Sequence, residues 1–108
     1  MPAQPVMSKE RVKVVEITVD SKGNPKIADE NKILVLSRPR NEEVLWVSDL
    51  PFRIDFKNGS PFYEDQFDHK YMQSGLVRRD VLPSEHRIYE YTIDVKGKKL
   101  DPGIKVFP

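Results

Sequence analysis

Short apolar runs interrupted by turn-forming residues are the feature that most constrains how this chain can fold. The runs are rich in Val, Ile, Tyr and Phe, and Gly, Pro, Asn or Asp breaks them about every 8 to 12 residues. Within the runs, Val15, Ile17 and Val19 alternate with polar neighbours, as do Tyr89 and Tyr91. A period of two gives a strand one buried face and one wet face. The sequence therefore predicts an all-β fold.

The spacing of these runs predicts a two-sheet Greek-key sandwich of about seven strands. The predicted strands are Val12–Val19, Ile33–Ser37, Val44–Val47, Phe52–Phe56, Leu76–Arg79, Ile88–Val95 and Ile104–Phe107. Residues 61–71 leave two alternatives open. Ser60 and Pro61 are typical of a helix start, and the aromatic residues that follow can form one face of a short helix. The same segment can instead be a long loop whose aromatic side chains close one end of the sandwich.

Length and composition set the domain organisation and exclude several functions. A chain of 108 residues is close to the usual size of one domain. Residues 1–8 contain two prolines and no apolar periodicity, which is typical of a flexible arm, so the domain is expected to span residues 9–108. With a net charge of only +1, the chain lacks the basic character expected of a nucleic-acid-binding protein. No apolar run is long enough to span a bilayer.

The absence of Cys excludes disulfides, thiolate nucleophiles and Cys-ligated metals. It leaves the cellular compartment open, although the lack of an export-signal pattern after Met1 favours the cytoplasm. No hydrolase, phosphate-loop, dinucleotide-binding or zinc-protease motif is present. The sequence therefore predicts no catalytic residue, and the chain is not expected to be an enzyme.

Two stretches resemble the cupredoxin superfamily, the Greek-key β-sandwich fold of plastocyanin. Val44–Val47 followed by Phe52–Phe56 is similar to the family's Trp-containing strand, short polar link and alternating strand that ends in Phe. Tyr89–Ile93 is similar to the strand that leads to the copper-ligating Cys, and Leu100–Val106 is similar to the closing strand. Within these stretches, the patterns Tyr-x-Tyr-Thr at Tyr89–Thr92 and Leu-Asp-Pro-x-Ile at Leu100–Ile104 resemble copper-free bacterial members of the superfamily. The resemblance therefore implies a cupredoxin-like fold.

The copper ligands of that family do not carry over to this chain. A blue-copper site uses two imidazoles and one thiolate. At the matched positions, Phe52 stands in place of the first His and Ile93 stands in place of the Cys. The resemblance therefore implies no copper, no electron-transfer activity and no other cofactor. Burial of Phe52 and Ile93 is expected to extend the core into the former metal pocket.

Candidate site residues concentrate between residues 62 and 71. The densest group of potential metal ligands consists of Glu64, Asp65, Asp68 and His69. A helix would bring them together as i,i+4 pairs, whereas a solvated loop explains them without a metal. The candidate ligand or partner contacts are the aromatic residues Tyr63, Phe67 and Tyr71. The residues expected in the core, because each lies in an alternating apolar run, are Trp46, Phe56, Tyr91 and Ile93.

The predicted function is a non-catalytic interaction or structural module that mediates protein–protein assembly, with another protein or a second copy as partner. Ile33–Leu36 is apolar on both faces, so this strand is expected to be central in its sheet or covered by a partner. Strand addition through Met1–Ser8 or Ile104–Pro108 is the expected route to assembly. The alternative is a module that binds a small ligand, sugar or metal through residues 62–71.

Overall fold

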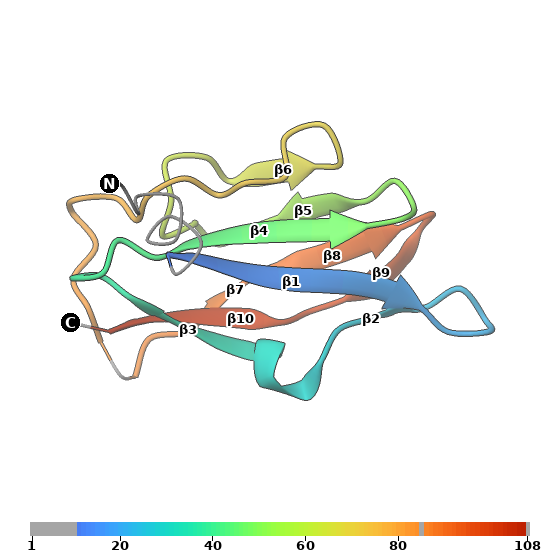
Figure 1. The fold of residues 1–108 in the computed structure, drawn as a ribbon, viewed down its shortest axis with the longest axis horizontal. Helices are drawn as coiled ribbons and strands as arrows, with labels where there is room; N and C mark the ends of the chain where they lie inside the picture. Colours follow the sequence, from blue (N-terminus) through green and yellow to red (C-terminus); the bar gives the residue numbers. More distant parts are fainter. Residues whose placement is uncertain (1–10, 85, 108) are drawn as a thin grey trace, which may run out of the picture.

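The computed structural model describes residues 11–84 and 86–107, so the predicted arm of residues 1–8 lies outside the described residues. The described residues form ten β-strands and one short 3-10 helix, η1 (Asp29–Asn31), as Figure 1 shows. The strands are β1 (Val12–Val19), β2 (Pro25–Lys26), β3 (Ile33–Ser37), β4 (Glu43–Ser48), β5 (Arg53–Asp55), β6 (Gln66–Asp68), β7 (Tyr89–Glu90), β8 (Thr92–Val95), β9 (Lys98–Leu100) and β10 (Gly103–Phe107). The all-β class predicted from the apolar alternation is confirmed.

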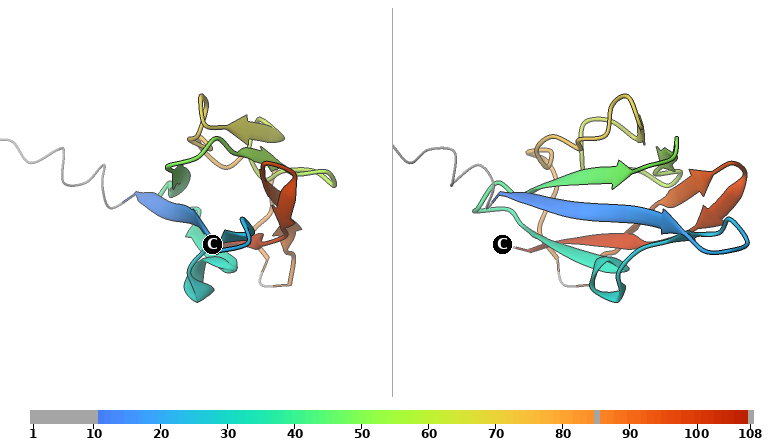
Figure 2. Two further views of the ribbon diagram at one scale, coloured as in Figure 1. Left: turned by 90° about the vertical axis from the view of Figure 1, so that its right-hand side faces the viewer. Right: turned by 45° about the vertical axis from the view of Figure 1, so that its right-hand side comes forward.

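Hydrogen bonds join these strands into three sheets. Their strand orders are β2-β1-β4, β3-β10-β7 and β6-β5-β8-β9. The pairs β1–β4 and β3–β10 are parallel, and the other pairs are antiparallel. The sheets curve around one interior, which Figure 2 shows end-on. The architecture is therefore roughly sandwich-like, with three hydrogen-bonded sheets where the sequence suggested two.

The core is made by the side chains that point inward from all three sheets. Alternation places Val15 and Ile17 of β1 inside, and the same holds for Leu34 and Leu36 of β3. The largest fully buried side chains are Trp46, Tyr91, Phe56, Phe62, Ile17, Leu36, Ile54, Ile93 and Ile104, with Val15, Val44 and Val95. The longer strands β1, β3, β4 and β10 thus each bury one row of apolar side chains, as period-two alternation requires.

Turn residues set how neighbouring strands meet. Lys96 and Gly97 adopt φ values of 53° and 87°, and their two-residue turn joins β8 to β9. Such left-handed conformations match the twist of a hairpin, and Gly accepts them without steric cost. Between β1 and β2, the Asp20 carboxylate accepts the backbone N–H groups of Lys22 and Asn24, each at 2.9 Å. This turn holds β2 against the end of β1.

Residues 61–71 form no helix, so the helical alternative is wrong. Gln66–Asp68 is strand β6, which pairs with β5. The Ser60 hydroxyl accepts the N–H of Phe62 at 2.8 Å, and this local turn resembles a helix cap in the sequence. The Phe56 N–H then donates to the Asp65 carbonyl at 2.8 Å, which ties both ends of the connection to β5 and β6.

Two predicted strands also differ from the structure. Leu76–Arg79 contributes only an isolated bridge between Val77 and Phe62. The predicted strand Ile88–Val95 is divided at Tyr91, whose N–H donates to the Pro102 carbonyl at 2.9 Å. Its two parts become β7 and β8, which belong to different sheets. The short strands β2, β6 and β9 were not predicted.

Candidate functional site

Aromatic side chains fill the centre of the molecule. Trp46 is fully buried, and its ring centroid lies 5.1 Å from that of Phe67, 5.6 Å from that of Tyr91 and 6.4 Å from that of Phe56. The Trp46 indole N–H donates a hydrogen bond to the Tyr91 hydroxyl oxygen at 3.2 Å. Ile93 is also fully buried. The four residues expected in the core therefore all lie in it.

The Tyr91 hydroxyl is the one ionisable group with a strongly shifted pKa among the described residues. Burial raises its pKa from 10.0 to about 12, because the phenolate would lose its hydration. The hydrogen bond from Trp46 partly opposes this shift, since an N–H donor favours the charged form. The pair lies in the core, where the Tyr91 hydroxyl satisfies the buried Trp46 indole N–H.

The aromatic residues of 62–71 do not form one surface. Phe67 is 3% exposed and belongs to the core, and it also borders the hollow that Tyr71 lines. Tyr63 is exposed, and its hydroxyl accepts the N–H of Arg79 at 3.3 Å. Tyr71 is also exposed and stacks against Phe67, with ring centroids 5.8 Å apart. A ligand could therefore reach Tyr63 or Tyr71, but these side chains line different hollows.

The potential metal ligands of this segment do not converge either. Glu64 and Asp65 are exposed in the connection before β6, and no helix turns them toward Asp68 or His69. The Asp68 carboxylate accepts the backbone N–H groups of Lys70 and Tyr71 at 2.8 and 3.0 Å. These bonds hold the Asp68 pKa below its usual value and assign the carboxylate to a tight turn. Across the described residues, no three His, Asp or Glu side chains gather as a metal site.

A shallow hollow of about 310 Å³ lies on the outer face of the sheet β6-β5-β8-β9. Arg53 of β5 stands between Asp68 and Asp94 in the cross-strand register. Lys99 follows Asp94 in the same row, and Tyr71 closes one side. The hollow thus offers one exposed aromatic ring beside charges of both signs.

The outer margin of β3 is a more distinctive surface. The Lys32 carbonyl accepts the N–H of Gly103 at 2.8 Å, and the N–H of Arg38 donates to the Phe107 carbonyl at 2.9 Å. In a parallel pair, the residues of one strand alternate between facing the partner and facing away. The even-numbered residues of β3 therefore bond to β10, and the backbone groups of Ile33 and Val35 face outward. Their side chains are 44% and 43% exposed.

Both ends of this open margin are closed by local hydrogen bonds. At the start, the N–H of Asn31 donates to the Ala28 carbonyl at 2.9 Å. At the end, the N–H of Ser37 donates to the Glu42 carboxylate at 2.7 Å, and the Ser37 carbonyl accepts the N–H of Glu42 at 3.3 Å. Glu42 is 4% exposed and lies 3.6 Å from the Lys13 ammonium. Among contacts with residues 11–84 and 86–107, only Ile33 and Val35 thus keep free backbone groups along β3.

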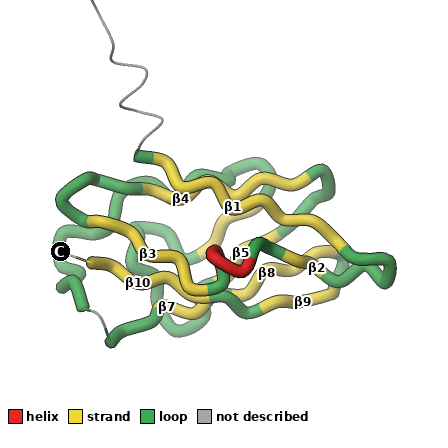
Figure 3. Tube along the Cα trace, turned by 60° about the horizontal axis from the view of Figure 1, so that its bottom comes forward, coloured by secondary structure: helices red, strands yellow, loops and turns green. Residues whose placement is uncertain are grey.

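The strand β1 has a second open margin. The N–H of Glu43 donates to the Arg11 carbonyl at 2.8 Å, so odd-numbered residues of β1 face β4 and Val14 faces outward. Val14 is 52% exposed and borders a hollow of about 500 Å³ that also reaches Ile27. Figure 3 shows β1 as the next strand beyond the free margin of β3, although it belongs to a different sheet.

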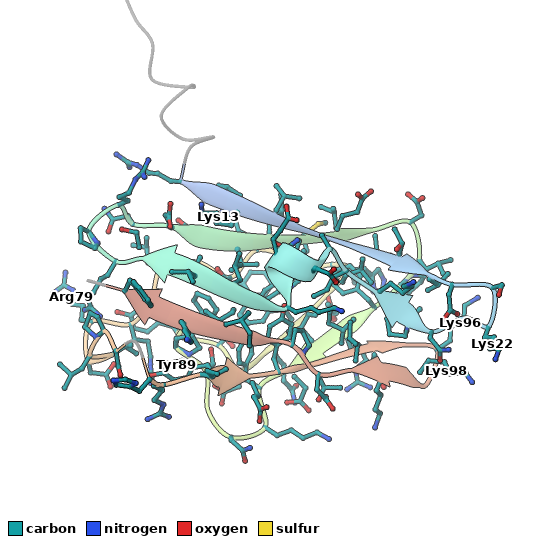
Figure 4. The ribbon with its side chains drawn as sticks, turned by 90° about the horizontal axis from the view of Figure 1, so that it is seen from below. Lys13, Lys22, Arg79, Tyr89, Lys96 and Lys98 are labelled. Atoms are coloured by element: carbon teal, nitrogen blue, oxygen red, sulfur yellow. The ribbon has the colours of Figure 1, made fainter. Side chains whose placement is uncertain are left out.

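Charge is distributed toward the two ends of the long axis. Figure 4 shows Lys22, Lys96 and Lys98 together at the end where the β1–β2 and β8–β9 turns lie. Arg79 lies at the opposite end, where the Arg38 guanidinium donates to the Arg79 carbonyl at 2.6 Å and to the Val81 carbonyl. These basic side chains therefore do not form one continuous patch.

The open β3 margin bears on two expectations about assembly. Ile33–Leu36 is not central, because β3 pairs only with β10 within the described chain, so of the two expected positions only a covered strand remains. The alternation was hidden from sequence reasoning, since the outward and inward residues are equally apolar. The strand β10 is central between β3 and β7, and the Val106 carbonyl accepts the N–H of Ser84 at 2.9 Å. The C-terminal strand is thus occupied and cannot be donated to a neighbour without breaking this sheet.

Comparison with known proteins adds no relative. No protein-family model matches the chain, and no curated protein or solved structure is significantly similar to it. In the part of the chain that the structure describes, no helix is long and apolar enough to cross a membrane. Evidence on function therefore comes from the geometry of the surfaces described above.

Proposed function

We propose that this chain is a non-catalytic β-sandwich module that assembles with other proteins through the open margin of β3. The observation that carries the proposal is the pair Ile33 and Val35, where free backbone groups and exposed branched apolar side chains occur together. Natural proteins usually protect such margins with charges, prolines or a covering segment. An extended segment that adds to the sheet would satisfy the backbone groups and cover the side chains.

The surface beside this margin favours the same mode of binding. Ile88 is 43% exposed and lies over Gly103 of β10, where the Ile33 side chain also approaches. Gly103 has no side chain to separate them, so the exposed apolar surface continues from β3 across β10. An added strand at the margin would extend this surface and remove part of it from water, which is the favourable term in most protein association.

The cupredoxin-like assignment, without copper or electron transfer, belongs to the same proposal. The matched ligand positions Phe52 and Ile93 are 2% and 0% exposed, so both side chains pack in the core. The chain also has no Cys to supply a thiolate. These residues support a sandwich whose interior serves packing, with function on its outer margins.

The proposal is tested by capture of partners from native extract with three proteins. Val35→Pro removes an N–H that faces outward and makes no bond to β10, so β3 should keep its place in the sheet. Val14→Pro is the matched control, because it removes the corresponding outward N–H from β1. We expect the unchanged protein and Val14→Pro to retain the same partner, whether another protein or this chain itself, and Val35→Pro to lose it. Retention of all partners by Val35→Pro would contradict the proposal.

A second candidate function is binding of a small polar ligand, such as a sugar, on the outer face of β6-β5-β8-β9. The observation that favours it is the exposed Tyr71 ring beside Arg53, Asp68 and Asp94 in one hollow. Aromatic rings commonly provide the apolar surface of such sites, and charged groups fix orientation. Screening soluble oligosaccharides for a rise in melting temperature tests this candidate. The rise should disappear in Tyr71→Ala and persist in Tyr63→Ala.

A further inference from the structure

We infer that the partner at the β3 margin is a second copy of this chain, whose own β3 pairs antiparallel with it across a two-fold axis. This inference rests on the proposed function and names its partner. Two-fold contacts use the same surface on both copies, so the surface must complement itself. The β3 margin meets this condition in its backbone groups, its side chains and its charges.

The backbone groups allow one register. In an antiparallel pair, opposite residues exchange both of their N–H and C=O groups when these face each other. Within the part of the chain that the structure describes, only Ile33 and Val35 of this margin have such groups free, because the N–H of Asn31 is bonded to Ala28 and both groups of Ser37 are bonded to Glu42. When Ile33 faces Val35 of the partner, every residue with free backbone groups lies opposite another residue whose backbone groups are free. This register places the two-fold axis at Leu34.

Shifting the register by two residues in either direction loses this match. In one shift, Ile33 faces Ile33 of the partner and Val35 faces Asn31, whose N–H is already used. In the other, Val35 faces Val35 and Ile33 faces Ser37, whose N–H and C=O are both used. The turn at η1 and the Glu42 carboxylate thus determine where a second strand can bind.

The side chains support the same pairing. Ile33 and Val35 point to the same outer face and are each more than two-fifths exposed in the single chain. In the inferred register, Ile33 of one copy lies beside Val35 of the other, and the same contact occurs again on the other side of the axis. Directly opposite side chains in a sheet are close enough to pack, and branched apolar pairs are favourable there. The pairing therefore forms one apolar cluster from four side chains that the single chain leaves in water.

Charges at the ends of β3 favour an antiparallel partner over a parallel one. The strand is preceded by Asp29 and Glu30 and followed by Arg38 and Arg40. The Asp29 carboxylate is 3.0 Å from the Lys32 ammonium. No ion pair among the described residues engages Glu30, Arg38 or Arg40, and the Arg38 guanidinium donates to the backbone carbonyls of Arg79 and Val81. Antiparallel pairing brings the acidic start of one copy beside the basic end of the other, whereas parallel pairing would place like charges together.

Sedimentation velocity over a wide concentration range tests whether the purified chain pairs in this way. We expect the unchanged protein and Val14→Pro to form dimers, and Val35→Pro to raise the dimer dissociation constant by about tenfold or more. Circular dichroism shows whether Val35→Pro is folded. If it is not, Val35→Lys replaces it, because this change keeps the backbone and places a charge in the apolar cluster on an already exposed position.

Cysteine mapping tests the register. The chain contains no Cys, so one introduced residue supplies the only thiol. Oxidation of an equal mixture of Ile33→Cys and Val35→Cys should give mainly the mixed disulfide, because these positions face each other across the axis. A symmetric disulfide formed readily by Ile33→Cys alone, or by Val35→Cys alone, would indicate a shifted register and contradict the inferred pairing. Val14→Cys is the control and should remain reduced.

The outcomes separate this inference from the proposed function. A protein that stays monomeric at every concentration, yet loses a captured partner on Val35→Pro, keeps the function at β3 and overturns the second copy as occupant. If Val14→Pro dissociates the dimer, whether or not Val35→Pro also does so, the dimer contact involves β1. That result also overturns the β3 pairing. Failure of both the dimer and the partner capture overturns both proposals.

Discussion

Replacement of Tyr91 by Phe removes one oxygen atom from the centre of the core and should destabilise the protein in a pH-dependent way. The Tyr91 hydroxyl accepts the buried Trp46 indole N–H at 3.2 Å, and Trp46 is fully buried. Without the hydroxyl, the indole N–H stays in the core with no acceptor. A buried donor left unpaired costs about 1 to 3 kcal/mol. Tyr91→Phe should therefore lower the free energy of unfolding by that amount at neutral pH.

The difference between the two proteins should shrink at high pH. Burial raises the pKa of Tyr91 from 10.0 to about 12 in the folded protein. Above pH 10 the unfolded chain releases this proton while the folded chain retains it, so the stability of the unchanged protein falls as pH rises. The loss is about 1.4 kcal/mol per pH unit until the folded pKa is reached. Phe cannot ionise, so this contribution is absent from the variant.

Urea unfolding provides the assay, because Trp46 is the only Trp and its fluorescence reports on the core. Unfolding free energies are measured for both proteins at neutral pH and at steps between pH 10 and about 12. Tyr71→Phe is the control, since this ring is 57% exposed, and its effect should stay within about 0.5 kcal/mol. A stability gap between the unchanged protein and Tyr91→Phe that stays constant across this pH range would refute the reasoning.

Three further substitutions test other parts of the fold. Trp46→Ala should cost about 3 to 5 kcal/mol in unfolding free energy, followed by circular dichroism, and a cost below about 1 kcal/mol would contradict the central position of the indole. Glu42→Ala should cost about 1 to 3 kcal/mol and speed amide hydrogen exchange at Ser37, because the acceptor of that N–H is lost; unchanged exchange would contradict the bond. Gly103→Ala should cost about 1 to 3 kcal/mol, because a Cβ there meets the Ile88 side chain. Urea unfolding of the double variant with Ile88→Ala should recover part of this loss, and additive effects would exclude the contact.

The fold class and much of the core could be predicted because burial repeats along the strands with period two. Val15 and Ile17, for example, alternate with exposed neighbours both in the sequence pattern and in the structure. Residues 61–71 could not be predicted in the same way. The hydroxyl of Ser60 makes the same kind of local hydrogen bond in a turn as at a helix start, and only pairing with β5 decides between them. Lys98 and Lys99 of β9 were missed because an exposed edge strand carries few apolar residues.

The candidate site was harder to predict than the fold, because it depends on which strands lie next to each other. Nothing in the composition of Ile33–Leu36 distinguishes a central strand from one at an edge. Sequence proximity was also a poor guide, since Tyr63 is close in the chain to Phe67 and Tyr71 but lines a different hollow. The closure of β3 at Ser37 by Glu42 depends on a turn whose geometry appears only in three dimensions.

The parallel pairing of β3 with β10 has a consequence for how the protein is made. Ile33 is paired with Gly103 and Ser37 with Phe107. The strand β3 therefore cannot form its sheet pairing until β10, which is about 70 residues later in the chain, has been synthesised. During synthesis, Leu34 and Leu36 have no sheet partner on β10 until residue 107 has left the ribosome. Closing so long a loop costs conformational entropy before the contacts between the two strands can form. All-β domains that depend on such distant pairings fold in about milliseconds to seconds. The nascent chain therefore exposes its most apolar strand while the residues between β3 and β10 are being made, and this interval is when a chaperone would be of greatest use.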